Sequence, residues 1–195
     1  MAATWGACLS GRMGAGDPLV VQDLAAAAGL SATPVREALA WLSGQGLVER
    51  RVGRGYFMVD PSAAEVAHLY ELHHRCLLWA LEYIGTAPGS PLNLLVSNPD
   101  ERAALLFRSV AASSANLVLV DVQGRAAARL RLLRHAEQGF CVVDEDALSR
   151  AEAAFAEGAH AELRRFIDDH HRERRDAADN IAAALRKPVR NIEQI

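Results

Sequence analysis

The chain has 195 residues, of which 51% are hydrophobic and 23% charged, so one or two domains with a substantial core are possible. Its net charge of −3 excludes a general electrostatic attraction to nucleic acid, and no apolar run reaches the roughly 18 residues of a membrane span. The first residues lack the basic segment of a signal peptide, and Cys8, Cys76 and Cys141 form no CxxC pair. We therefore expect a cytoplasmic protein with free thiols.

Residues 4 to 44 predict a short helix over 4–10, then two helices joined by a tight turn. Gly29 ends the first of these two, Ser31 suits the N-cap of the second, and Pro34 fits its first turn. Apolar residues recur at helical spacing at Val20, Val21, Leu24, Ala28, Val35, Leu39 and Leu42. The second helix starts with small polar residues and Arg36, which suits a helix that enters the DNA major groove by its N-terminus.

A basic hairpin is predicted directly after this helix. Residues 47–51 and 56–59 have the composition of strands, and 52–55 that of a glycine-containing turn. Three arginines, Arg50, Arg51 and Arg54, lie on or beside the turn, where they can reach phosphates or the minor groove. The layout is that of a winged helix-turn-helix.

The segment from Ser10 to Val59 resembles the DNA-binding domain of GntR-family transcriptional regulators, most specifically over SATPVREAL, residues 31–39. The resemblance implies a homodimer on a double-stranded, pseudo-palindromic operator. It implies DNA contacts by Gln22, Ser31, Thr33, Arg36, Arg50, Arg51, Arg54 and Gly55. One position departs from the pattern, because many relatives carry a basic residue where this chain has Ala32.

The charge of residues 1 to 60 keeps a second interpretation open. This segment holds five arginines and five acidic residues, although phosphate contacts normally supply much of the affinity for DNA. The alternative is a helical small-molecule-binding or interaction protein whose winged domain has lost DNA binding. Clustering of three of the arginines in the hairpin favours the regulator.

Residues 61 to 195 predict an all-helical domain, so the chain is mainly α and divides into 1–60 and 61–195. Asp60-Pro61-Ser62 marks the boundary, because proline stops the strand and serine can cap the next helix. Apolar periodicity predicts helices over 62–84, 100–112, 116–137, 144–157 and 159–186, with a loop over 85–99.

The order and spacing of these helices resemble the FCD branch of the GntR family. Phe107-Arg108 followed by Ser114 to Asn116 is similar to the family's Phe-His followed by Gly-Asn. The segment from Ala154 to His170 is similar to its last two helices. The resemblance implies a bundle that dimerises and binds a small-molecule effector, such as a fatty acid or another carboxylate.

Many FCD relatives hold a metal ion with one Asp or Asn and three His residues. On the family pattern these positions fall here on Ala104, Arg108, Leu148 and His170. Because zinc sites use three or four protein ligands, we expect no metal cofactor. We hypothesise that Arg108 replaces the cation and binds a carboxylate, with His73, Asn116 and His170 completing the effector site. A salt bridge between helices is the simpler alternative for Arg108.

Other chemistry is not indicated. His73 and His170 share the apolar faces of their helices, where a lone histidine is commonly a hydrogen-bonded core residue. The run from Asp168 to Asp176 predicts a solvated face with ion pairs. The chain contains no GxSxG, HExxH or P-loop motif, so we expect no enzyme activity.

Overall fold

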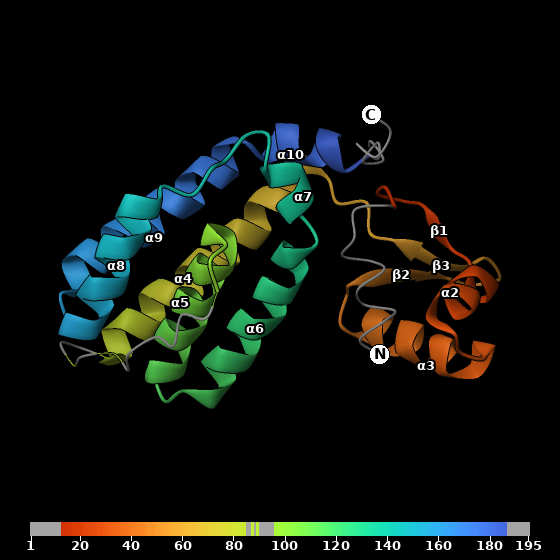
Figure 1. Ribbon diagram of the computed structural model, residues 1–195, viewed down its shortest axis with the longest axis horizontal. Coiled ribbons are helices and arrows are strands. Elements are labelled where there is room, and N and C mark those ends of the chain that lie inside the picture. Colours follow the sequence, from red (N-terminus) through yellow and green to blue (C-terminus); the bar gives the residue numbers. More distant parts are fainter. Residues whose placement is uncertain (1–12, 85–86, 88, 90–95, 187–195) are drawn as a thin grey trace.

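The protein consists of a small winged part and a larger helical bundle, which lie side by side (Figure 1). The computed structural model describes residues 13–84, 87, 89 and 96–186. The predicted helix over 4–10 and most of the predicted loop over 85–99 lie outside these residues. Within the described part of the chain, no helix is long and apolar enough to cross a membrane.

The winged part is a helix-turn-helix followed by a hairpin, as predicted. Its elements are β1 (Pro18–Leu19), α2 (Val21–Ala28), α3 (Ala32–Gly44), β2 (Val48–Arg51) and β3 (Gly55–Met58). The strands form an antiparallel sheet in the order β1-β3-β2. Strand β1 was not predicted, since two residues are too few to show periodicity. The core contains Leu24, Val35, Leu39, Leu42 and Val48, all nearly inaccessible to solvent.

The turn between α2 and α3 follows from its local sequence. Gly29 adopts φ 63°, a left-handed conformation that costs glycine little, and its N–H donates to carbonyls of the last turn of α2. Ser31 occupies the N-cap of α3 with an extended backbone, yet its side chain makes no capping hydrogen bond. The predicted N-cap position is therefore confirmed, but the Ser31 hydroxyl is not used by the helix.

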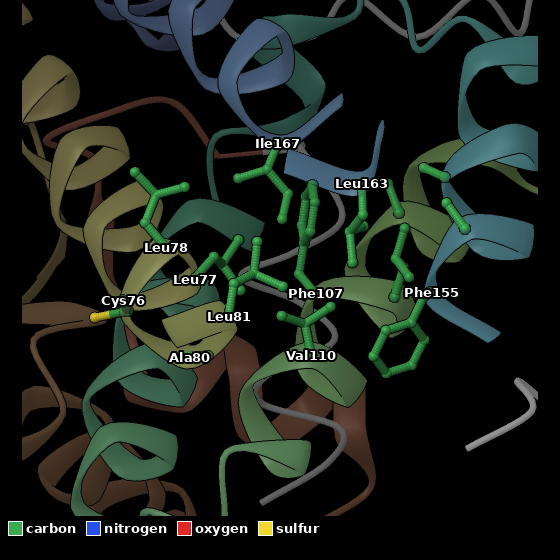
Figure 2. Close-up of a cluster of buried hydrophobic side chains, with 14 of the residues drawn as sticks. Cys76, Leu77, Leu78, Ala80, Leu81, Phe107, Val110, Phe155, Leu163 and Ile167 are labelled. Carbon is green, nitrogen blue, oxygen red and sulfur yellow. The ribbon is translucent and has the colours of Figure 1, made fainter. Parts of the chain in front are cut away.

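The bundle is built around its first helix. Its elements are α4 (Ala63–Ile84), α5 (Pro99–Ser113), α6 (Leu117–Arg131), α7 (Arg134–Glu137), α8 (Glu145–Glu157), α9 (His160–Asp176) and α10 (Ala178–Leu185). Helix α4 packs against α5, α6, α9 and α10. Figure 2 shows Leu77 and Leu81 of α4 beside Phe107, Val110, Leu163 and Ile167 from the surrounding helices.

Side-chain caps set several of the helix starts. Ser62 and Glu65 form reciprocal hydrogen bonds at the start of α4, a capping box. Asn98 accepts from the Glu101 N–H ahead of α5, Asn116 accepts from Leu119 ahead of α6, and Asp144 caps α8. These boundaries agree with the predicted helices to within one or two residues.

Two predicted helices are each divided in the structure. The helix expected over 116–137 ends at Arg131, and α7 follows after Leu132 and Leu133. The helix expected over 159–186 breaks at Ala177, so that α10 can pack against α4 and α7. In both segments, the apolar residues have helical spacing before and after the break. Tertiary packing, which periodicity does not report, introduces the two bends.

The winged part and the bundle share a packed seam. Leu132, between α6 and α7, is 8% exposed and belongs to the winged core, together with Leu42, Leu47 and Val48. Leu133 faces the other way, into the bundle. An Arg186–Asp60 ion pair of 2.8 Å and a hydrogen bond from the Ala15 N–H to the Leu185 carbonyl lie across the same seam. Leu132 thus anchors the bundle in the winged core.

Replacing Leu132 by alanine should lower the free energy of unfolding by about 2–3 kcal/mol, because a buried leucine is lost and the cavity cannot fully collapse. Urea unfolding followed by circular dichroism measures this change. The matched control is Leu117→Ala at a side chain that is 82% exposed, which should stay within about 0.5 kcal/mol of the parent. Equal effects of the two substitutions would contradict a packed seam.

Candidate functional site

The exposed face of α3 carries the polar residues expected to reach DNA. Ser31, Thr33 and Arg36 are exposed, whereas Val35 and Leu39 point into the winged core. None of these three polar side chains has a hydrogen bond or ion pair to another described residue. The helix therefore presents free hydroxyls and a free guanidinium at its N-terminal end, the end that reads base edges in helix-turn-helix proteins.

The hairpin presents two free arginines and one that is held. Arg50 and Arg54 are exposed and form no ion pair with any described residue. Arg51 donates to Glu49 at 2.8 Å, and its guanidinium lies 4.2 Å from the centre of the Phe57 ring. Arg51 would have to leave these partners to contact a phosphate.

The remaining predicted DNA contacts lie on the same domain. Gln22 is exposed in the first turn of α2, and Gly55 is exposed at the end of the hairpin turn with φ 96°. A side chain would be strained at that φ, so glycine suits a tight wing tip. The structure places all eight predicted residues on the winged domain and leaves seven of them exposed.

A small cavity lies inside the bundle between α4, α5, α6, α7 and α9. Its volume is about 50 Å³, and His73, Phe107, His170, His171 and Arg174 form part of its wall. The predicted site residues His73 and His170 therefore meet here. A space of this size suits one or a few water molecules and is too small for a metabolite.

A chain of hydrogen bonds determines the protonation of two histidines beside the cavity. His171 Nδ1 lies 2.7 Å from the Ile167 carbonyl, which can only accept, so Nδ1 carries the proton. His171 Nε2 then accepts from His73 Nδ1 at 2.8 Å, and His73 Nε2 accepts from the Gln123 amide at 2.9 Å. Both imidazoles are neutral, because a further proton would place two donors face to face.

Burial also favours the neutral form of these histidines, because it lowers their pKa values. It lowers the pKa of His73 to about 4, with a smaller contribution from His74. Burial is also the main cause that holds the pKa of His171 and of His170 well below the usual histidine range. The residue His170 as a whole is partly exposed, whereas its imidazole ring lies against the rings of Phe107 and Phe166.

A second polar network closes the cavity. Arg174 is 1% exposed, and its Nε donates to Glu137 at 3.0 Å while Nη1 donates to the His170 carbonyl at 3.1 Å. Its Nη2 has no hydrogen-bond partner and lies 3.8 Å from the Asp100 carboxylate. Tyr70 donates to Glu137, and burial followed by the Glu137 charge raises the Tyr70 pKa well above its ordinary value. The network joins α4, α5, α7 and α9.

The four family positions for a metal do not come together as ligands. Ala104 and His170 line the cavity, whereas Leu148 is fully buried among apolar side chains and Arg108 is exposed. Among the described residues, no group of three or more histidine, cysteine or acidic side chains has a geometry that could hold a metal ion. One imidazole cannot hold a divalent ion, so these residues do not fit the metal of the FCD branch.

The other two predicted effector residues lie apart from the cavity. Arg108 lines an open groove between α5 and α6 instead. Asn116 caps α6 through its side-chain oxygen and lines neither hollow. It follows Ala115, which has φ 54°, at the position where the family resemblance gives glycine. The four residues of the predicted effector site are therefore split between three places.

Sequence reasoning missed the polar residues that the cavity depends on. The charge pattern predicts a solvated face for Arg174 and His171, yet both side chains are buried. Their spacing from Leu163 and Ile167 on α9 places them on the inward face, and this signal was available. Gln123 and Glu137 carried no such signal, since their partners are distant in the chain.

Residues 7–58 match the family model of bacterial regulatory proteins, gntR family. The winged part of the chain therefore matches this family, and the helical bundle lies outside the matched residues. The matched segment includes α2, α3 and both strands of the hairpin, hence all eight of the predicted DNA-contacting residues.

Solved GntR structures share the fold over nearly the whole chain. A GntR transcriptional regulator from Rhodococcus sp. RHA1 aligns with a TM-score of 0.69 at 20% identity, covering 89% of this chain and 94% of that one. E. coli McbR/YncC aligns with a TM-score of 0.64 at 15% identity, covering 91% and 93%. No curated protein sequence matches the chain. The winged domain followed by a helical bundle is thus the architecture of GntR regulators.

The buried histidines predict an acid-sensitive fold. Unfolded His73 titrates near 6.5 and folded His73 near 4, so the unfolded state binds more protons between these values and stability falls as pH is lowered. At pH 7 this difference in pKa contributes about 3 kcal/mol to the free energy of unfolding, and nearly all of it is lost when the pH reaches 4. Urea unfolding at pH 7 and pH 5 should show the loss, and His73→Gln should reduce this pH dependence. His68→Gln, at an exposed position of α4, is the control, and equal slopes for both variants would contradict the assignment.

Proposed function

We propose that this protein is a DNA-binding transcriptional regulator of the GntR type, acting in the cytoplasm on a double-stranded operator. The observation that carries the proposal is the face of α3, where Ser31, Thr33 and Arg36 are exposed and unpartnered above a buried apolar face. Arg50 and Arg54 extend this polar surface onto the wing. Such a surface can combine base contacts from α3 with phosphate or minor-groove contacts from the wing.

The regulator acts as a homodimer in this proposal, so that two recognition helices meet half-sites about 34 Å apart, one turn of DNA. An exposed apolar stripe on α4 supports a second copy as its partner. It contains Leu72, Trp79 and Tyr83, which are 45%, 61% and 61% exposed. Val118 and Val122 of the neighbouring helix α6 are exposed as well. Exposed aromatic and aliphatic side chains in a row are typical of protein interfaces.

The bundle serves as the effector domain. A small molecule, by resemblance a carboxylate metabolite, would favour one arrangement of the two winged domains over another and so change operator affinity. The seam supports this mechanism, because Leu132 of the bundle is part of the winged core. A movement of the α6–α7 segment therefore acts directly on the winged domain.

A helical binding protein that has lost DNA binding is the competing function. Two observations favour it: Ala32 stands at a position that is basic in many relatives, and residues 1 to 60 carry equal numbers of arginines and acidic residues. Both functions share the fold. Titration with upstream and scrambled DNA separates them.

Fluorescence-anisotropy titration of DNA from upstream of the coding region, against scrambled DNA and over a salt series, tests the regulator. Binding should be specific and should weaken as salt rises, because phosphate contacts release counterions. Arg36→Ala should lose about 1–3 kcal/mol if the guanidinium contacts a base edge. Arg164→Ala, on the surface of α9 at the side of the bundle away from the winged part (Figure 1), is the control and should bind as the parent does.

The wing arginines complete this test. The Arg50→Ala, Arg54→Ala double variant should lose affinity equally for specific and scrambled DNA, and its salt dependence should be shallower. If the parent shows no preference for upstream DNA, and if neither the Arg36 nor the wing substitutions alter residual binding, the helical binding protein is the better description.

Trp79→Glu should convert the dimer to a monomer, because a charge would then be buried in an apolar interface. Light scattering after size-exclusion chromatography measures the mass. Trp41→Glu is the matched control, since Trp41 is also exposed, at 51%, but lies on α3 of the winged domain. A Trp79→Glu variant that remains dimeric would place the interface elsewhere.

A further inference from the structure

An open groove between α5 and α6 is large enough for a small molecule. Its volume is about 530 Å³, within the range of about 300–1,000 Å³ typical of ligand sites, whereas the histidine cavity measures about 50 Å³. Alanine, glycine and aliphatic residues form the floor, among them Ala104, Leu105, Val120, Gly124 and Ala127. The small side chains leave the space, and their apolar atoms suit a hydrocarbon chain.

Three arginines without ion-pair partners line this groove. Arg108, Arg131 and Arg134 have no salt bridge or hydrogen bond to any other part of the chain that the structure describes. Several other surface arginines of the bundle are paired, such as Arg125 with Asp121 at 3.0 Å and Arg172 with Asp169 at 2.5 Å. Glu101 is the acidic residue in the lining, so the groove carries a net charge of +2 from three arginines and one glutamate.

The positive charge is divided between the two ends of the groove. Helices α5 and α6 form an antiparallel hairpin through the short turn from Ser114 to Asn116, and Arg108 lies toward this turn. Arg131 and Arg134 lie at the far end, with Glu101 of α5 beside that end. Glu101 and Arg108 are seven residues apart on α5, hence about 10 Å along the helix. Each end therefore has a net charge of about +1, with an apolar floor between them.

We propose that this groove is the effector site and that it binds a linear acid with an anionic group at each end and an apolar chain between. The proposal rests on the effector response put forward above and adds the chemical class of the ligand. Guanidinium groups bind carboxylates through two parallel charged hydrogen bonds, which gives each end of the groove a defined partner. The buried histidines of the neighbouring cavity then support the fold and do not contact the ligand.

The far end of the groove adjoins the seam with the winged domain. Arg134 lines both the groove and the internal cavity, and it lies two residues after Leu132, which is buried in the winged core. An acid group held by Arg131 and Arg134 would restrain the α6–α7 segment. Ligand binding in the groove is therefore coupled to the position of the winged domain through this segment.

Isothermal titration calorimetry of the full chain with suberate, octanoate and octanediol tests the ligand class. These probes share an apolar chain of the same length and carry two, one and no acid groups. Suberate should bind with one site per chain and about ten-fold more tightly than octanoate, because one charged contact is added. Octanediol should bind most weakly. Equal affinities for suberate and octanoate, or no binding by either at millimolar concentration, would overturn the proposal.

Substitutions locate the two acid groups. Arg108→Gln should remove the advantage of suberate over octanoate, whereas Arg131→Gln should weaken both acids about ten-fold. Arg125→Gln, on the opposite side of α6, is the matched control and should leave both affinities unchanged. All three residues are exposed, so the variants should keep the parent's circular dichroism spectrum. Unchanged suberate binding in both Arg108→Gln and Arg131→Gln would exclude this groove.

The DNA titration keeps the two proposals separate. Specific DNA binding without any binding of suberate would refute the groove as a diacid site and leave the regulator intact. Binding of suberate with the expected variant pattern would support the groove as a diacid site. If the parent also showed no preference for upstream DNA, and the Arg36 and wing substitutions left residual binding unchanged, the regulator would be refuted.

Discussion

The bundle depends on the burial of one guanidinium. Arg174 is almost fully inaccessible, and a charge at that depth is tolerated only if it is paired and hydrogen-bonded. Glu137 supplies the opposing charge, Tyr70 donates to Glu137, and Asp100 faces the same guanidinium. Four helices are thereby held in one arrangement. Removal of one partner would leave an uncompensated buried charge, which is usually more costly than the intact pair is stabilising.

The two hydrogen-bonded histidines beside this network, His73 and His171, are buried polar groups that also need partners. The hydrogen bonds run in one direction, from the Gln123 amide through His73 and His171 to the Ile167 carbonyl. This order of donors and acceptors requires both imidazoles to be neutral. Positive charge from Arg174 lies nearby and further disfavours protonation of His170 and His171. These polar groups enclose the cavity that His170 also lines. Here they complete one another, and a ligand for the bundle has to be sought outside this cavity.

The two halves of the molecule are joined where a helix is interrupted. Between α6 and α7, Leu132 enters the winged core, Leu133 enters the bundle core, and Arg134 reaches both the groove and the cavity. Three neighbouring residues thus face different parts of the molecule. In the proposed mechanism, this segment is the element through which a ligand in the bundle changes the position of the winged domain.

The sequence by itself determined the winged helix-turn-helix and its exposed polar residues. Gly29, Ser31 and the apolar spacing of Val35, Leu39 and Leu42 act over a few residues, so local pattern was sufficient. It also placed most helix boundaries of the bundle, because a capping residue such as Ser62 acts locally. Only the tertiary structure decided that Arg174 is buried, that Arg108 faces a groove and that α6 stops at Arg131. Each of these outcomes depends on a partner far away in the chain, and the pattern of a single helix carries no information about that partner.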